Sequence, residues 1–182
     1  MRKFDRVLQR WRIGKVRPYV PAGARVLDIG SSDGALYECF PDLDQYVGIE
    51  PSLAGDRSLG PNARLIRGIF PRDLTDPAPF DTICMLAVLE HIPPDAHPTI
   101  ASGCFEHLRR GGHLVVTVPS PRTDAVLYAI KFLRIIDGMS MDQHYGFDPT
   151  QAVGLFSGAG LRLVKKSRFQ FGFNNLFVFQ RP

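Results

Sequence analysis

The stretch Val26-Leu-Asp-Ile-Gly-Ser-Ser-Asp-Gly34 decides the fold, because it joins a short apolar run to a loop with a glycine at each end. Residues 25–30 have the composition of a buried parallel strand, and residues 35–40 are expected to form the helix that follows. Glycine lets the backbone approach a ligand closely, and a helix N-terminus directs amides and a positive dipole end toward an anionic group. The stretch therefore predicts a ligand-binding unit, with an ordinary tight turn as the structural alternative.

The rest of the chain repeats this alternation. Further strands are predicted at 45–50, 63–67, 80–86 and 113–118, and helices at 2–16, 52–59, 99–110, 123–136 and 148–159, the last with Asp148 as N-cap. Residues 161–169 and 176–180 are joined by a connection too short for a crossover helix, so they are expected to form an antiparallel hairpin. The sequence predicts an α/β fold with a three-layer, Rossmann-like open sheet, mostly parallel with an antiparallel C-terminal hairpin strand.

Length and composition favour a single domain over residues 1–182, with an N-terminal helix within 1–20 and a lid-like insertion at 120–147. The net charge of +4 is unevenly placed, because the first 25 residues hold eight Lys or Arg against one acid, Asp5. The sequence has neither a secretory leader pattern nor an apolar run of about 18 residues. Its three cysteines lack the spacing of a zinc site or a disulfide framework. We expect a cytoplasmic protein that holds no metal.

Glu50 stands twenty residues beyond Gly30, at the end of the second predicted strand. An acid at this place can accept hydrogen bonds from both ribose hydroxyls of a nucleoside ligand, although an ordinary exposed carboxylate is the alternative. A nicotinamide dinucleotide site requires the pattern G-x-G-x-x-G. The loop Gly30-Ser-Ser-Asp-Gly34 lacks the third glycine, which disfavours that ligand class.

Several ordered motifs resemble the class I S-adenosylmethionine-dependent methyltransferases, in particular the small-molecule type that includes ubiquinone-pathway O-methyltransferases. The matching segments are 26–34, 47–52, 80–93, 108–119 and 144–162. Within them, Phe80-Asp-Thr-Ile-Cys-Met-Leu-Ala-Val-Leu-Glu-His-Ile-Pro93 is similar to the family's fourth strand and following loop. Leu108-Arg-Arg-Gly-Gly-His-Leu-Val-Val-Thr-Val-Pro119 is similar to its glycine turn and fifth strand.

The resemblance implies S-adenosylmethionine as the cofactor and assigns its contacts by position. The methionine part is assigned to the glycine loop, with Asp28, Gly30, Ser31, Ser32 and Gly34. The ribose is assigned to Glu50 and Pro51 after the second strand, and the adenine to Ile69 and Phe70 after the third. The sulfonium is assigned to Leu86, Ala87 and Val88 after the fourth strand.

Two positions depart from the family pattern. Ser32 replaces the usual middle glycine, which is acceptable if its backbone angles are ordinary. Ile69 replaces an acid that often contacts adenine. We expect Ile69 and Phe70 to hold adenine by apolar contact, while a backbone amide contacts its polar edge.

Catalysis and acceptor binding are expected at the carboxyl edge of the sheet. A general base assists transfer to a hydroxyl, and His91 and His144 are the candidates; each has a structural role as its alternative. His144 aligns with a histidine often seen in this family's loop. Tyr128 and Tyr145 are candidate substrate contacts in an apolar insertion, which favours a small, partly hydrophobic, hydroxylated acceptor. The insertion's apolar side chains could equally cover the sheet.

Two other functions remain open. One is a catalytically silent subunit of this fold that binds a partner; the intact Gly30, Gly34 and Glu50 argue against it. The other is a nucleic-acid methyltransferase that uses the basic N-terminus. The sequence lacks the N/D-P-P-Y/F motif, a catalytic Cys-Pro pair and an added RNA-binding module, so nucleic acid is not the expected partner.

The N-terminal helix has an apolar stripe opposite a basic face. The stripe consists of Phe4, Val7, Leu8 and Trp11, and the basic face of Arg2, Arg6 and Arg10. In the family that it resembles, a leading helix commonly packs near the cofactor cleft and closes over the substrate. The alternative is an interfacial helix that contacts anionic membranes peripherally. The short stripe favours the lid.

Overall fold

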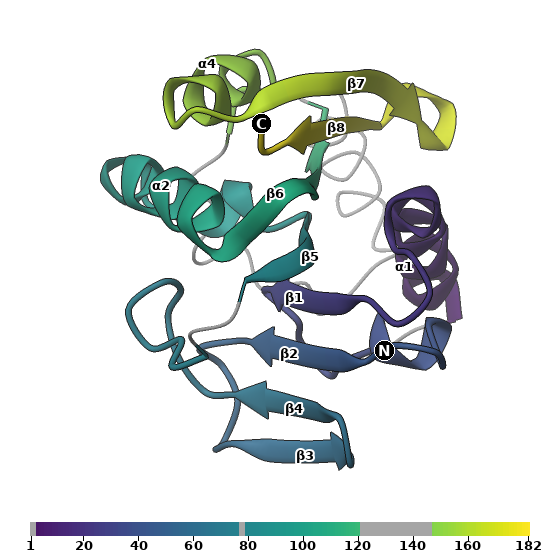
Figure 1. Cartoon of the computed structure of the whole chain (residues 1–182). Coiled ribbons are helices and arrows are strands. Elements are labelled where there is room, and N and C mark those ends of the chain that lie inside the picture. The colour runs from purple at the N-terminus through teal and green to yellow at the C-terminus, as the bar shows by residue number, and fades with distance from the viewer. Residues whose placement is uncertain (1–2, 77–78, 121–146) are drawn as a thin grey trace.

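The computed structural model describes residues 3–76, 79–120 and 147–182, with side chains from residue 6 onward. These residues contain one eight-stranded sheet with the order β3-β4-β2-β1-β5-β6-β8-β7 (Figure 1). The strands are β1 Arg25–Ile29, β2 Gln45–Ile49, β3 Arg57–Gly60, β4 Ala63–Ile66, β5 Phe80–Leu86, β6 Leu108–Pro119, β7 Arg162–Phe169 and β8 Asn174–Gln180. Strands β1, β2, β4, β5 and β6 are mutually parallel, whereas β3 and β8 run antiparallel to their neighbours.

Helices cover both faces of this sheet. Helices α2 (His97–His107) and α4 (Gln151–Gly158) lie on one face, and α1 (Lys3–Val16) lies on the other (Figure 1). The sheet has an apolar core on each face: Ile100 and Phe156 belong to the first, and Ile13 and Val16 to the second. The three-layer α/β prediction is confirmed. No helix among the described residues is long and apolar enough to cross a membrane.

The short 3₁₀ turns connect these elements. They are η1 Arg17–Tyr19, η2 Tyr37–Cys39, η3 Leu89–His91, η4 Pro94–Ala96 and η5 Gln170–Gly172. The predicted C-terminal hairpin is confirmed, with β8 inserted between β6 and β7. Because β8 has a strand on each side and helices near its face, Phe177 and Phe179 are completely buried.

The helix predicted at 35–40 is wrong. These residues form turns and the three-residue η2. Only six residues separate Gly34 from Pro41, too few to offset the cost of helix nucleation. Phe40, which precedes the proline, has left the helical region with φ −136° and ψ 81°. The glycine loop is therefore followed by no α-helix N-terminus that could bind an anionic group.

The helix predicted at 52–59 is also wrong, because part of it forms β3. Gly55 and Gly60 disfavour a helix at this point, and β3 pairs antiparallel with β4 through Arg57 opposite Leu65. The strand lies at the edge of the sheet and its residues are exposed or half-buried, so it lacks the apolar pattern by which strands are recognised.

Two other helices differ from the prediction at their ends. Helix α2 ends at His107, and the strand expected at 113–118 is the second half of the longer β6. The N-cap prediction at Asp148 is wrong, because α4 begins at Gln151. The Asp148 carboxylate instead accepts the amide of Thr150 at 2.9 Å, which forms a turn before the helix. The helix predicted at 123–136 lies outside the described residues.

Helix α1 is confirmed, and its burial differs along its length. The residues that it buries are Ile13 and Val16, near its C-terminal end. Val7 and Trp11 remain 60% and 39% exposed, and the Phe4 side chain lies outside the described part. Of the predicted stripe, Val7 and Trp11 are therefore exposed, whereas Leu8 is half-buried.

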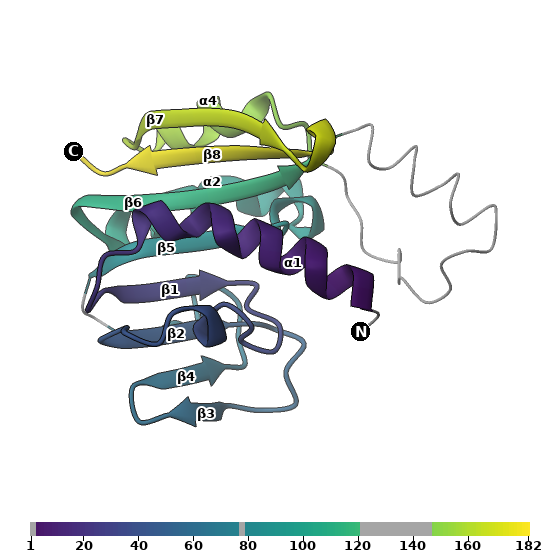
Figure 2. The ribbon, with the colours of Figure 1, turned by 90° about the vertical axis from the view of Figure 1, so that its right-hand side faces the viewer.

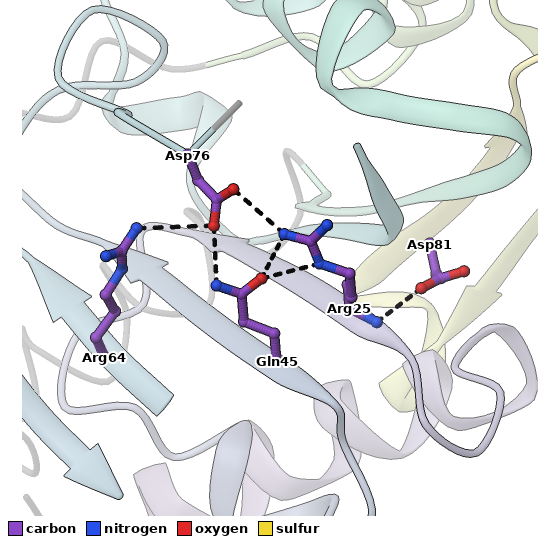
Figure 3. Close-up of polar contacts among 5 residues, drawn as sticks. All are labelled: Arg25, Gln45, Arg64, Asp76 and Asp81. Atoms are coloured by element: carbon purple, nitrogen blue, oxygen red, sulfur yellow. Dashed lines mark hydrogen bonds and ion pairs between the residues drawn. The ribbon is translucent and has the colours of Figure 1, made fainter. Parts of the chain in front are cut away.

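A network of side chains joins the amino ends of the central strands (Figure 3). Asp76, which follows β4 and is 8% exposed, pairs with Arg25 at 3.2 Å and accepts the Gln45 amide at 2.9 Å. Arg64 lies 3.7 Å from the same carboxylate. Asp81 accepts the backbone amide of Arg25 at 2.7 Å. These contacts link β1, β2, β4 and β5 at the edge from which the parallel strands start.

Candidate functional site

A cleft of about 910 Å³ opens at the carboxyl edge of β1, β2 and β5. Its volume lies within the range of about 300–1,000 Å³ that is typical of small-ligand sites. The lining is largely apolar and comes from the ends of these strands and the approach to α2. It includes Ile29, Gly30, Ile49, Glu50, Pro51, Ser52, Gly68, Ile69, Phe70, Pro71, Arg72, Ala87, Val88, His91, Ile92, Pro93, Ala96, Thr99 and Ile100.

Gly30 forms the floor of the cleft where β1 ends. Its φ of +75° lies in the left-handed region, and its amide donates to the Ile49 carbonyl at 2.9 Å. A Cβ at this position would lie 2.5 Å from a methyl group of Val88. Both the backbone angle and the close approach of Val88 therefore require glycine here.

The rest of the glycine loop lies outside the cleft lining. Gly34 also has a positive φ, +85°, but the atom that a Cβ would meet belongs to Leu59, at 2.6 Å, in the β3 region. Ser31 is buried and Ser32 is exposed. The condition of ordinary backbone angles at Ser32 is not met, since its φ is +50°. The structure thus brings Gly30 alone of these four into the cleft lining.

Asp28 lies beneath the loop and is 5% exposed. Its carboxylate accepts a hydrogen bond from the Tyr46 hydroxyl at 2.8 Å. Burial raises the pKa of Asp28 to about 7; the Tyr46 hydrogen bond lowers the pKa and the charge of Glu50 raises it. Asp28 supports the floor of the cleft from below and is not among the residues that line it.

Glu50 follows β2 and lines the cleft with Pro51 and Ser52. Its amide donates to the Ile66 carbonyl at 3.0 Å, which fixes its backbone against β4. One carboxylate oxygen accepts the Ser52 amide at 2.9 Å. Since a carboxylate has about four acceptor sites, it can still accept two ligand hydroxyls.

Ile69 and Phe70 both line the cleft but differ in burial. Ile69 is 51% exposed, whereas Phe70 is 3% exposed and its ring packs edge-on against His107 at 5.6 Å. The Ile69 amide is already engaged, because it donates to the Asp73 carboxylate at 2.7 Å. Arg72 pairs with the same carboxylate at 2.9 Å and, with the Ile69 amide, lowers the pKa of Asp73 to about 2.

The loop after β5 forms the opposite wall. Ala87 has a φ of +62°, a strained value for a residue with a side chain, and its amide donates to the Thr117 carbonyl at 3.0 Å. Val88 and the exposed His91 line the cleft beside it. Leu86 ends β5 and packs with the core on the α1 face. His144, Tyr128 and Tyr145 lie outside the described residues.

Sequence reasoning missed the wall that leads into α2. Ile92, Pro93, Ala96, Thr99 and Ile100 line the cleft there, although only their place after the fourth strand could have indicated it. It also missed Asp73, whose signal is an acid four residues after Ile69. Over the part of the chain that the structure describes, no group of three or more His, Cys, Asp or Glu could hold a metal ion.

Comparisons with known proteins identify the family of the chain. A family model described as a methyltransferase domain matches residues 2–166. A ubiquinone biosynthesis O-methyltransferase of Xylella fastidiosa (strain 9a5c) is 31% identical over 136 residues, covering 65% of this chain and 52% of that protein. The chain therefore spans about half the length of this curated relative.

Solved structures share the fold at low identity. The 1,6-didemethyltoxoflavin-N1-methyltransferase of Burkholderia thailandensis matches with a TM-score of 0.70 and 17% identity, over 94% of this chain and 77% of that chain. Its structure contains bound 1,6-didemethyltoxoflavin and S-adenosylhomocysteine. The magnesium protoporphyrin IX methyltransferase of Synechocystis PCC 6803, with bound S-adenosylhomocysteine, matches with a TM-score of 0.63 and 15% identity. The match covers 97% of this chain and 83% of that chain.

Proposed function

The chain belongs to the methyltransferase domain family, and on that premise we propose that it transfers a methyl group from S-adenosylmethionine to a small, partly hydrophobic, hydroxylated acceptor. S-adenosylmethionine is the cofactor of this class I methyltransferase. The observation that carries the proposal is the cleft, because Gly30, Glu50, Val88 and His91 all line one cavity at the carboxyl edge of the sheet.

The residues present fit this cofactor. Glu50 supplies the acceptor for the ribose hydroxyls, and the apolar walls around Ile69 and Ile100 suit a flat adenine ring. The glycine floor at Gly30 allows a ligand to approach the backbone. Asp28, just beneath this floor, places a titratable carboxyl under the end expected to hold the methionine part.

The cofactor brings a methyl group that is already activated by its sulfonium charge. The protein's part is to align the acceptor and exclude water, and the apolar wall at Ala87 and Val88 serves the second purpose. His91 stands at the same wall, where an imidazole can take the proton of an acceptor hydroxyl. The Xylella relative, named as an O-methyltransferase, supports a hydroxyl acceptor. His144, Tyr128 and Tyr145 remain predicted contributors.

Calorimetric titration of the purified protein tests the proposal. S-adenosylhomocysteine is expected to bind saturably, whereas NAD is expected not to bind. Binding of NAD in place of S-adenosylhomocysteine would contradict the proposed function. With a panel of hydroxylated small molecules as acceptors, His91→Gln is expected to lower kcat about a hundredfold without changing the affinity for S-adenosylhomocysteine. Unchanged turnover in that variant would remove His91 as the base.

A further inference from the structure

The turn between β7 and β8 exposes a phenylalanine almost completely. Phe171 is 90% exposed, and both it and Gln170 lie in the left-handed region, with φ of +56° and +51°. Such angles are unfavourable for residues with side chains and persist only where the surroundings impose them. A ring this exposed contributes little to the core, so its position on strained backbone calls for another explanation.

Buried hydrogen bonds hold this turn in place. Gln170 is 3% exposed, and its side-chain amide donates to the Leu8 carbonyl of α1 at 3.0 Å. The side-chain oxygen Oε1 of Gln170 accepts a hydrogen bond from the side-chain amide of Asn174. The turn is therefore fixed to α1 from below, while Phe171 projects outward from it.

Helix α1 extends this apolar surface. The ring of Trp11 meets that of Phe171 edge-on, with centroids 5.8 Å apart and planes at 87°. Val7 lies one helical turn before Trp11 and is 60% exposed. We call Val7, Trp11 and Phe171 the aromatic patch. In the described part of the chain the other exposed large apolar residues are Ile69, in the cleft, and Val164.

Exposed arginines accompany the aromatic patch. On α1, Arg6 directly precedes Val7 and Arg10 directly precedes Trp11, each about 100° around the helix from the apolar residue that follows it. Arg168 is exposed on β7, three residues before Phe171. The first 25 residues carry eight basic side chains and a single acid. A partner that complements this surface must therefore offer both an apolar region and negative charge. A second copy of the same surface would bring like charges together, which disfavours a symmetric dimer.

The aromatic patch is separate from the cleft. None of the residues that line the cleft belongs to α1 or η5, and α1 lies on the sheet face opposite α2. The N-terminal end of α1 and the turn after β7 nevertheless lie at the end toward which the arrowheads of β1, β2 and β4 point (Figure 2). No described residue of α1 lines the cleft, and a lid formed by this helix stays a prediction.

We propose that the aromatic patch and its flanking arginines form a docking surface for an anionic lipid bilayer. Trp and Phe side chains enter the interfacial region of a bilayer, while arginines contact its anionic headgroups. Two anchoring elements, α1 and the β7–β8 turn, act together because Gln170 ties them. The proposal is independent of the acceptor, since it concerns a surface outside the cleft.

Co-sedimentation with vesicles tests this docking surface. The full chain is mixed with vesicles of phosphatidylcholine alone or with about one third phosphatidylglycerol, at low and high salt. We expect binding to the anionic vesicles that weakens with salt. Phe171→Asn, which keeps a residue that tolerates the left-handed region, is expected to weaken binding about tenfold. Arg6→Gln combined with Arg10→Gln is expected to weaken it by a similar factor.

Matched controls alter comparable residues outside the patch. Val164→Thr changes another exposed apolar residue of β7, and Arg110→Gln changes an exposed arginine at the opposite edge of the sheet. Both are expected to bind vesicles like the wild type, and circular dichroism confirms that each variant is folded. Absent binding to anionic vesicles, or equal binding by Phe171→Asn, would overturn the proposal. So would a lipid-free dimer that Phe171→Asn dissociates, because the surface would then be a self-association site.

Discussion

Each end of the parallel strands has a buried aspartate, and the two aspartates have opposite electrostatic surroundings. At the amino edge, Asp76 is paired with Arg25, hydrogen-bonded to Gln45 and near Arg64 (Figure 3). At the carboxyl edge, Asp28 accepts a hydrogen bond from the neutral Tyr46 hydroxyl, and the nearby charge of Glu50 disfavours its ionisation. The first carboxylate is compensated by cations, and the second is held in a setting that favours its protonated form.

The same contrast extends to the backbone. At the carboxyl edge, Gly30 and Ala87 adopt positive φ angles beside the cleft, and Val88 touches the glycine floor closely. At the amino edge, Gly111 also has a positive φ, but nothing lies within 4 Å of where its Cβ would be. Stabilising contacts are thus concentrated where the strands begin, and strained or uncompensated groups where they end. This is the division expected if binding occurs at the carboxyl edge.

The largest expected effect concerns the pH dependence that Asp28 imposes. Its pKa is raised in the folded state, so the folded protein holds this proton more tightly than the unfolded chain. The resulting stability is complete below about pH 4 and is lost as the pH rises to about 7, a total of about 4 kcal/mol. Urea unfolding of Asp28→Asn between pH 4 and 8 is expected to lack this slope. Asp33→Asn, which changes an exposed aspartate in the loop after β1, is the control. An equal slope in wild type and Asp28→Asn would contradict the contrast.

The next effect comes from removing the shared carboxylate at the amino edge. Asp76→Ala leaves Arg25 and Gln45 without their shared carboxylate and is expected to lower the free energy of unfolding by about 3 kcal/mol. Affinity for S-adenosylhomocysteine should remain near the wild-type value, because the cleft lies at the other edge. Chemical denaturation and calorimetry measure the two quantities, with Asp44→Asn as an exposed neighbour for comparison. If the free energy of S-adenosylhomocysteine binding fell by more than the free energy of unfolding, the amino and carboxyl edges would be coupled.

Removing the ribose acid reverses this pattern. Glu50→Ala is expected to reduce the affinity for S-adenosylhomocysteine at least tenfold, since each charge-assisted hydrogen bond contributes about 1.5–3 kcal/mol. Unfolding free energy should change little, because Glu50 is partly exposed and makes one side-chain hydrogen bond to Ser52. Calorimetric titration checks the affinity. Wild-type affinity in this variant would mean that the ribose binds elsewhere.

The smallest effect separates strain from function. In Gly111→Ala the added Cβ meets no neighbour, so only the positive φ is unfavourable. We expect this variant to lose about 1 kcal/mol of unfolding free energy, with cofactor affinity unchanged. Gly30→Ala adds a contact with Val88 and is expected to lose affinity as well. Truncation of the obstructing side chain in Gly30→Ala/Val88→Ala should restore part of the lost affinity. Identical behaviour of the two alanine variants would show that Gly30 acts only through its backbone angle.

The strand pattern was predictable because apolar runs identify buried parallel strands. Residues 25–30, 45–50 and 80–86 matched β1, β2 and β5 closely, since each strand has neighbours on both sides. The edge strand β3 was missed because its exposure leaves no apolar signal. The helix expected after Gly34 fails because too few residues precede Pro41.

The site was predictable where it depends on strand ends and not where it depends on long-range packing. Gly30, Glu50 and Val88 fall in one cleft because parallel strands end at a common edge. The position of Gly34 against Leu59 and the Ile69 amide bound to Asp73 depend on tertiary contacts that no local pattern encodes. The burial of Ile13 and Val16 in α1 was not predictable, because periodicity does not say which apolar residues of a helix meet the sheet.

The place of β8 in the sheet sets the order in which the chain completes its fold during synthesis. Strand β7 reaches the sheet only through β8, which the ribosome makes after it. Until β8 emerges, β7 has no partner strand, and the flank of β6 that includes Val115, Val116 and Val118 lacks the strand that will cover it. Products of translation that stop before residue 174 therefore present an open apolar strand to other chains, and we expect them to aggregate or to require a chaperone.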